Sequence, residues 1–377
     1  MQNTDRNLPS VQGKGLILLI PTLLFFIIAF ILLYPSEIGW DFQNNLWAPA
    51  HLLLQSKSPY NIHVFIEQAN AVWLPFGITI FLPLGALPGQ QAYNLWILIE
   101  TFSLFGILYL YSKHWKKGLK TILFFFFLFV LFPPVMTNFV LGQISLIIVF
   151  VFSIILLQWD TLSPILMGLL IAFTLSKPQL CIYILPAIFL VNWKHHSKKR
   201  AFRIAGFSIL WCLLLLIPFY LFYPRWLQDL LINLELNHIW MHPNLTTYFS
   251  DWTGLNRLIF NIPLALIGFA LTLFVVLRLP PQKALAWSLV LTPQFTPYIW
   301  SWDFVFVFPL LLETILSAPN TKKRWIFLGG FILAEIVFIV MKVLGYYSDH
   351  FYWWFPIIIN ALLLAGNLPC FKPAKTY

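Results

Sequence analysis

The chain has 377 residues, of which 60% are hydrophobic and only 10% are charged, and its formal net charge is +10. A soluble domain carries roughly 25% charged residues, so this composition excludes a soluble globular protein and indicates a polytopic integral membrane protein. The cations lie in short clusters between apolar runs, as in the loops of membrane proteins, so the positive charge does not indicate a nucleic-acid partner.

The apolar runs predict an all-α protein that forms a single membrane domain over residues 1–377. A helix rises about 1.5 Å per residue and the hydrocarbon layer is about 30 Å thick, so a span needs about 20 residues, or fewer where the membrane thins. About twelve spans follow, the first of them retained rather than cleaved as a signal peptide. They run at about 15–34, 91–112, 121–136, 139–157, 164–176, 178–192, 204–222, 258–278, 284–300, 304–318, 326–344 and 352–368.

Basic clusters set the expected orientation, because cytoplasmic loops are enriched in Lys and Arg. The clusters expected to be cytoplasmic are "KHWKKGLK" (113–120), "NWKHHSKKRAFR" (192–203), "RLPPQK" (278–283), "NTKKRW" (320–325) and the tail "FKPAKTY". Two long connections then lie outside, at about 35–90 and about 223–257.

The segment "AVWLPFGITIFLPLGALPGQ" (71–90) breaks this alternation. Either it is a Pro-interrupted in-plane or re-entrant element of the first external loop, or it spans the membrane and the next Lys cluster violates the rule. Pro75, Pro83 and Pro88 would disrupt a straight span, so we favour an interfacial or re-entrant element.

The stretch "GWDFQNNLWAPAHLLLQSKSPYN" (39–61) puts an acidic residue, Asp41, just beyond the first apolar run. Ionisable groups next to lipid are energetically costly, so they are candidates for function. One interpretation makes Asp41 the N-cap of an in-plane helix that ends at the turn 58–61. The other makes Asp41 a general base that takes a proton from a sugar hydroxyl at the membrane edge. The two roles are compatible.

Two cations also lie at external boundaries of predicted spans. Lys177 lies in "LSKPQL", and Arg257 begins the span at 258–278. Each side chain either extends to the membrane interface or pairs with a phosphate at the membrane surface.

Amides and aromatic residues mark two further external turns. In "PPVMTNFVLGQIS" (133–145), Asn138 and Gln143 either bond to neighbouring helices or line a cavity. In "TPQFTPYIWSWDF" (292–304), Trp302 fits an interfacial aromatic belt or a surface that stacks on sugar rings. Asp303 is not explained by a belt, because a belt does not require a carboxylate.

No metal site is predicted. The three cysteines have no metal-ligand spacing, and His238 and His242 are four apart but are followed by Pro243 and Asn244, which end a helix.

Several short motifs follow one another in a distinctive order. They are Asp41-Phe42 with the turn Pro59-Tyr60-Asn61, "WLPFGITIFLPLGALP" (73–88), "AYNLW" (92–96), Pro133-Pro134 before Asn138 and Gly142-Gln143, Lys177-Pro178, and the segment 297–308. This order resembles glycosyltransferase family 87, a mannosyltransferase-like group among the multispanning GT-C glycosyltransferases, best over residues 15–200. The family's usual Gly-Gln-x-Asn reads Gly142-Gln143-Ile144-Ser145 here.

The resemblance implies a GT-C-like fold in the plasma (inner) membrane with the active site on the extracytoplasmic side. It implies inverting transfer of a sugar, a hexose such as mannose, from a polyprenyl-phosphate donor to an acceptor hydroxyl on a lipid or glycan. No cofactor is identified, and dependence on a divalent metal stays open. The implied roles are general base for Asp41, donor-phosphate binding for Lys177, Arg257 and Gln143, and sugar or acceptor binding for Asp303, Asn138, Trp302 and Tyr60.

Two alternatives from other classes stay open. A transporter or lipid flippase would place paired charges near mid-membrane, where Glu100 and Glu335 are the main acidic residues and have no matched repeats. A structural subunit of an envelope assembly would leave Asp41 as a helix cap only.

Overall fold

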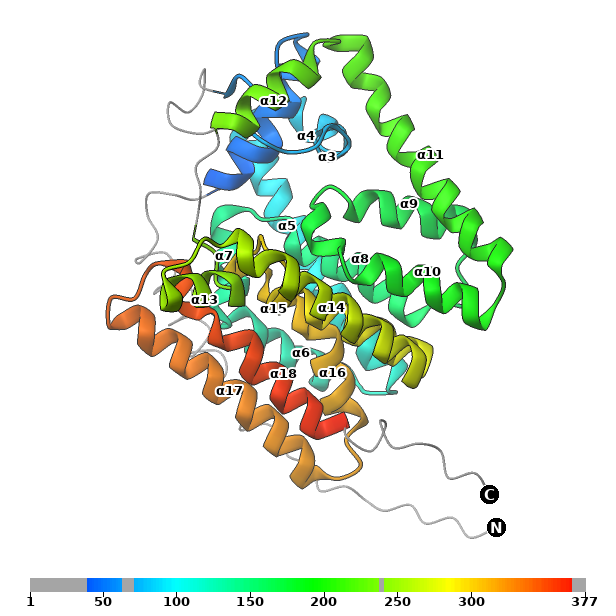
Figure 1. Ribbon diagram of the computed structural model, residues 1–377, viewed down its shortest axis with the longest axis vertical. Helices are drawn as coiled ribbons and strands as arrows, with labels where there is room; N and C mark the ends of the chain where they lie inside the picture. The colour runs from blue at the N-terminus through cyan, green and yellow to red at the C-terminus, as the bar shows by residue number, and fades with distance from the viewer. Residues whose placement is uncertain (1–38, 63–70, 237–240, 368–377) are drawn as a thin grey trace. The chain divides into compact units, whose positions relative to one another are not determined.

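The computed structural model describes residues 39–62, 71–236 and 241–367, so the predicted span at 15–34 lies outside the described residues. All regular elements within these ranges are helices, which confirms the all-α prediction for this part of the chain (Figure 1). The elements of the first half are η1 (Phe42–Trp47), α2 (Ala48–Leu54), α3 (Pro75–Ile80), α4 (Leu82–Gly85), α5 (Gly89–His114), α6 (Leu119–Val130), α7 (Pro133–Leu141), α8 (Ser145–Leu157), α9 (Pro164–Thr174), η3 (Pro178–Cys181) and α10 (Ile184–His195). Those of the second half are α11 (Lys198–Phe222), α12 (Trp226–Leu236), α13 (Leu245–Thr253), α14 (Leu258–Arg278), α15 (Pro281–Phe295), η4 (Ser301–Val307), α16 (Phe308–Ser317), α17 (Thr321–Val343), η5 (Asp349–Tyr352) and α18 (Trp354–Asn367).

Four of the described helices, α5, α11, α14 and α17, are long and apolar enough to cross a membrane alone. Helices α6 and α7 together would make a fifth span, bent by 74° at the break between them. Other predicted spans form shorter apolar helices, such as the 13-residue α8 and the 11-residue α9. The length and apolar character of these helices support an integral membrane protein, and the number of twelve spans stays a prediction.

The segment 71–90 is interrupted as predicted. It forms only α3, of six residues, and α4, of four residues. A proline stands at the start of each new helix of this segment. Pro75 and Pro83 lie in the first turns of α3 and α4, and Pro88 directly precedes α5. Proline interrupts a preceding helix because its ring fixes φ and it has no N–H to donate. Six helical residues extend about 9 Å, so neither piece crosses a bilayer alone. Placement in the membrane plane stays a prediction.

A glycine contact joins the start of the described chain to the turn between α7 and α8. Gly142 ends α7 in the left-handed region, at φ +71°, and a Cβ added there would lie 2.5 Å from the Cβ of Phe42. Gly39 N donates to Val140 O at 2.6 Å, and the indole of Trp96 on α5 donates to Gly142 O at 3.0 Å. These contacts hold η1 against the turn, which brings Asp41 next to Gln143.

Aromatic packing encloses the later part of the chain. Phe129 of α6 stacks on Phe308 of α16 with ring centroids 3.9 Å apart, and Phe331 of α17 packs on Phe129 edge-on. The short helix η4, just before α16, packs against α7, α8 and α15. Every residue of η4 except Trp302 is buried, so this helix carries Asp303 into the protein interior.

The close approach at Gly142 generates a prediction about stability. Gly142→Ala combines left-handed backbone strain of about 1–2 kcal/mol with steric overlap against Phe42 of a further 1–3 kcal/mol or so. Gly254 provides a matched control, because its φ is +70° but an added Cβ would meet nothing within 4 Å. Thermal unfolding of the purified protein in detergent should therefore show a clearly larger loss for Gly142→Ala than for Gly254→Ala. Equal losses would contradict the packing of η1 on this turn.

Candidate active site

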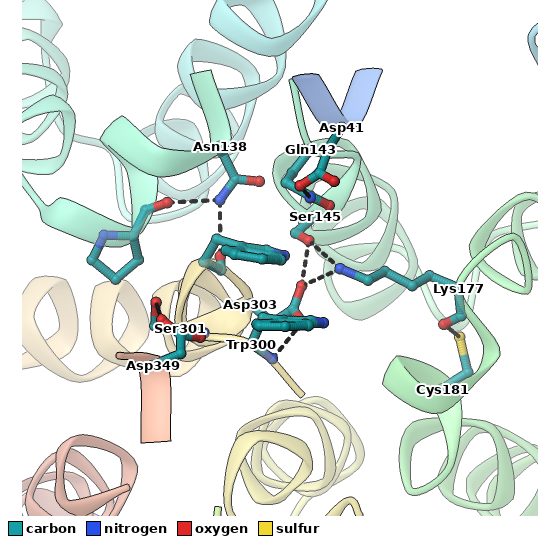
Figure 2. A network of polar contacts seen from close by, with 12 residues as sticks. Asp41, Asn138, Gln143, Ser145, Lys177, Cys181, Trp300, Ser301, Asp303 and Asp349 are labelled. Atoms are coloured by element: carbon teal, nitrogen blue, oxygen red, sulfur yellow. Dashed lines mark hydrogen bonds and ion pairs between the residues drawn. The ribbon is translucent and has the colours of Figure 1, made fainter. Parts of the chain in front are cut away.

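The centre of the candidate site is a buried ion pair between Lys177 and Asp303 (Figure 2). The Nζ of Lys177 lies 2.6 Å from Oδ1 of Asp303, and the two residues are 5% and 0% exposed. Ser145 joins both: its hydroxyl donates to the same Asp303 oxygen at 2.5 Å and accepts from Lys177 Nζ at 3.2 Å. These bonds compensate for the removal of both charges from water.

Local sequence explains the position of each partner. Pro178 follows Lys177, and a residue before proline is driven out of the helical region, so Lys177 is extended at φ −128°, ψ 74° between α9 and η3. Asp303 is the third residue of η4, and its second carboxylate oxygen accepts the backbone N–H of Trp300 at 3.1 Å. Asp303 therefore both caps its own helix and pairs with the lysine.

A second carboxylate, from a segment closer to the C-terminus, holds the start of η4 in place. Asp349, at the start of η5, accepts the backbone N–H of Ser301 at 2.7 Å and its hydroxyl at 2.6 Å. Burial raises the pKa of Asp349, although the bonds from Ser301 oppose this shift. Asp303 and Asp349 together hold the segment 300–303 in place.

Asp41 lies beside this ion pair and is only half-buried. Gln143 Nε2 donates to Oδ2 of Asp41, and Asn45 Nδ2 donates to Oδ1 at 3.1 Å. Gln143 stands two residues before Ser145, so the turn at the start of α8 connects Asp41 to the ion pair. Burial raises the pKa of Tyr298, and the negative charges of Asp303 and Asp41 add to this rise, whereas the side-chain hydrogen bond with Trp300 opposes it.

The N-cap interpretation of Asp41 is wrong. Asp41 already has helical φ and ψ, −68° and −35°, and its side chain makes no capping hydrogen bond. Because the helix begins before Asp41, the carboxylate is directed to the side chains of Asn45 and Gln143 instead. The residues after it form a π-helix, η1, a type of turn that is frequent at functional sites.

Aromatic side chains form one wall of the site. Trp300 and Trp302 stack with centroids 4.7 Å apart and an interplanar angle of 9°, and Lys177 Nζ lies 5.9 Å from the ring centroid of Trp302. Asn138, fully buried on α7, donates to the carbonyl of Trp302 at 2.8 Å. For Asn138 the helix-bonding interpretation is therefore confirmed, and the amide also positions the aromatic wall.

His242 extends this wall. Its ring lies 4.2 Å from that of Tyr298 and 5.0 Å from that of Trp300, centroid to centroid, the latter edge-on at 88°. Burial, with the positive charge of Arg257 acting in the same direction, lowers the pKa of His242 to about 4. His242 is therefore neutral at physiological pH, and Arg257 lies close enough for its charge to act on the edge of the site.

The fold thus brings together Asp41, Asn138, Gln143, Lys177, Trp302 and Asp303 from the predicted set. Tyr60 is not among them. Its hydroxyl donates to Trp73 O at 3.1 Å and its carbonyl accepts from Asn233 of α12, in the turn after α2. Helices η1 and α2 separate this turn from Asp41 by roughly 20 Å.

Sequence reasoning missed Ser145, and it counted His242 and Asp349 among the ionisable residues of the outer boundary without giving either a role in the site. A serine at a helix start and a histidine in a polar loop are ordinary, so neither stands out by residue type. Ser145 had one signal: it replaces the asparagine usual in the resembling family two residues after Gln143. Among the described residues, no group of three or more His, Cys, Asp or Glu side chains is arranged to hold a metal ion.

Comparison with known proteins gives one match. The model of glycosyltransferase family 87 matches residues 73–297, more than half of the chain. The matched range includes Lys177, begins after Asp41 and ends before Asp303. No curated protein and no solved structure matches the chain.

The ion pair predicts a strong and specific effect on stability. Lys177→Met leaves the Asp303 charge buried and unpaired, which is expected to lower the free energy of unfolding by about 3–5 kcal/mol. Adding Asp303→Asn removes that charge while keeping an acceptor for Ser145, so the double variant should recover much of the loss. Chemical denaturation of the unaltered protein, the two single variants and the double variant measures the coupling free energy between the two side chains. Lys199→Met, at an exposed position on α11, is the control, and a loss no greater than that of the control would contradict the pairing.

The buried histidine predicts a pH dependence. His242 has its pKa lowered from an ordinary 6.5 to about 4, so the unfolded chain binds the proton first as the pH falls. The contribution of neutral His242 to the free energy of unfolding is therefore complete above pH 6.5. It is lost as the pH falls from 6.5 to 4, and the loss is at most about 3 kcal/mol. His242→Gln should flatten the stability curve in this window, whereas the same change at exposed His114 should not. Unfolding midpoints from pH 4 to 7.5 test this, and parallel curves for all three proteins would disprove it.

Proposed function

Because the chain belongs to glycosyltransferase family 87, we propose that it transfers a hexose such as mannose from a polyprenyl-phosphate donor to an acceptor hydroxyl on a lipid or glycan. Family membership makes the chain a glycosyltransferase, so the transporter alternative is set aside. The observation that carries the proposal is the position of a partly buried acidic residue, Asp41, beside the ion pair of Lys177 and Asp303.

The proposed general base is Asp41. Two neutral amide groups, from Gln143 and Asn45, orient its carboxylate without protonating it. Asp41 is only partly buried, so an acceptor hydroxyl can approach it from the surface of the site. Asp303 is less suited to this task, because it is fully buried and neutralised by Lys177.

The proposed reaction is a single displacement. As Asp41 takes the hydroxyl proton, the acceptor oxygen forms a bond to the anomeric carbon. The bond from that carbon to the phosphate oxygen breaks, and its electron pair leaves with the polyprenyl phosphate. One displacement inverts the anomeric configuration and needs one base.

Lys177 is the proposed partner of the departing phosphate. An ammonium has three N–H donors, and two of those of Lys177 are directed to Ser145 and Asp303. The remaining donor can stabilise the negative charge that develops on the phosphate oxygen, with Gln143 and Arg257 as the other candidates. The stacked indoles of Trp300 and Trp302 offer an aromatic surface for the sugar ring.

The path of the chain supports an extracytoplasmic site. Helix α5 begins near Asp41, where Trp96 bonds to Gly142, and is followed by the basic cluster 113–120. Helix α10 follows Lys177 and η3 and ends at the cluster 192–203, and α14 runs from Arg257 to the cluster 278–283. The candidate site and the basic clusters therefore lie at opposite ends of these helices. Since basic clusters favour the cytoplasmic side, the site is proposed to face outward from the plasma (inner) membrane.

Asp41→Asn tests the base directly. The amide keeps the shape of the side chain but accepts no proton, so transfer from a radiolabelled polyprenyl-phosphate hexose should fall by roughly 10²–10⁴-fold. The unfolding midpoint should stay close to that of the unaltered protein. Asp251→Asn, at an exposed position on α13, is the matched control and should keep full activity. Unchanged transfer by the Asp41 variant would refute its role as base, and retention of the anomeric configuration in the product would refute the single displacement.

A further inference from the structure

A cavity lined by cations and apolar side chains lies away from the candidate active site. It has a volume of about 290 Å³ and lies between the starts of α6 and α17 and the end of α16. This is roughly the volume that ten water molecules occupy in the liquid. Three cations line it, Lys117, Lys120 and Arg324, and none of the acidic residues that the structure describes does.

The cations of this cavity are not neutralised by the walls around them. The Nε of Arg324 is buried without a hydrogen-bond partner among the described residues. The one described carboxylate on α16, Glu313, accepts from the indole of Trp115 at 2.9 Å and does not line the cavity. A buried guanidinium nitrogen without a partner is unfavourable, so the cavity is suited to an acceptor that the chain itself does not supply.

Backbone geometry adds to the positive potential. Helix α6 begins at Leu119, which puts Lys120 and Thr121 in its first turn, and α17 begins at Thr321, which puts Arg324 in its first turn. The N-terminal ends of two helices therefore meet at the cavity, and such ends attract anions through their N–H groups and dipoles.

The remainder of the lining is apolar. Phe124, Phe125, Leu316 and Leu328 form this part, and Trp325 beside them is 60% exposed. An exposed tryptophan next to lysines is typical of the level where lipid headgroups lie. A cavity that combines cations with an oily wall fits a ligand that has both a phosphate and an acyl chain.

The cavity also lies at the basic ends of the spanning helices. Helix α5 extends about 27 Å from Trp96, which contacts the turn at Gly142, to its end at His114, just before the lysines that line the cavity. From Arg324 to its end at Val343, helix α17 extends about 29 Å toward the loop that contains Asp349. Under the positive-inside rule this end faces the cytoplasmic leaflet, whose anionic lipids attract basic pockets.

We propose that this cavity binds the headgroup phosphate of an anionic phospholipid of the cytoplasmic leaflet, held by Lys117, Lys120 and Arg324. The bound phosphate accepts from the unpartnered Arg324 Nε, and the acyl chains lie along the apolar wall. The lipid joins α6, α16 and α17, so it stabilises the end of the protein opposite the active site. This site is independent of the proposed sugar transfer.

Thermal unfolding of the full-length protein in detergent tests the proposal. Phosphatidylglycerol in mixed micelles should raise the unfolding midpoint in a saturable way, whereas phosphatidylcholine should not. Lys120→Gln and Arg324→Gln should each weaken the apparent affinity for phosphatidylglycerol by about tenfold, because each removes a charge-assisted hydrogen bond. Lys120 is exposed, so its variant should fold even if the Arg324 variant does not.

The matched control is Lys322→Gln. Lys322 lies in the same first turn of α17, is exposed and does not line the cavity, so this variant should bind phosphatidylglycerol within about twofold of the unaltered protein. An equal loss of affinity for phosphatidylglycerol in the control would show that general surface charge causes the effect, and it would overturn the proposal. Equal stabilisation by phosphatidylcholine would overturn it as well. Stabilisation by millimolar inorganic phosphate alone would assign the cavity to a free anion instead of a lipid.

Discussion

The buried ion pair between Lys177 and Asp303 holds together segments that are 126 residues apart in the sequence. Two charges inside a protein are tolerated only when each is paired and hydrogen-bonded. Asp303 meets this condition by accepting from Lys177, Ser145 and the backbone of Trp300. The pair therefore requires that η3, α8 and η4 keep their relative positions, and the aromatic wall of the site depends on the same arrangement.

The two carboxylates of the site differ in their surroundings. Asp303 is fully buried and bonded to a cation, whereas Asp41 is only partly buried and bonded to the amides of Gln143 and Asn45. A pair of acids in unlike environments can take different roles, one fixed and the other available for proton transfer. This asymmetry supports a proposed division of tasks in which Asp303 positions Lys177 and Asp41 acts on the acceptor.

Much of the site could be predicted from sequence, because charged residues beside apolar runs are few and costly. Asp41, Lys177 and Asp303 stood out for this reason. The capping role of Asp41 could not be judged, since it depends on where the helix begins, and boundaries are poorly encoded by local pattern. Ser145 was missed and His242 was given no role, because both gain significance only where α8, η4 and the loop before α13 meet. The predicted prolyl breaks at 71–90 were correct, because proline acts locally on its own backbone.

Local sequence is enough to specify the helical membrane character of the protein and the gathering of basic clusters at one end of its helices. Both follow from local properties, namely apolar runs and the charge of the connections. Which polar groups meet depends on the packing of the folded chain: Gln143 meets Asp41, and Lys177 meets Asp303, each across more than 100 residues. The tertiary structure also divided several apolar runs into short or bent helices and formed the cation-lined cavity between α6, α16 and α17. Such pairings depend on how remote helices pack, and neither hydropathy nor charge along the chain specifies that packing.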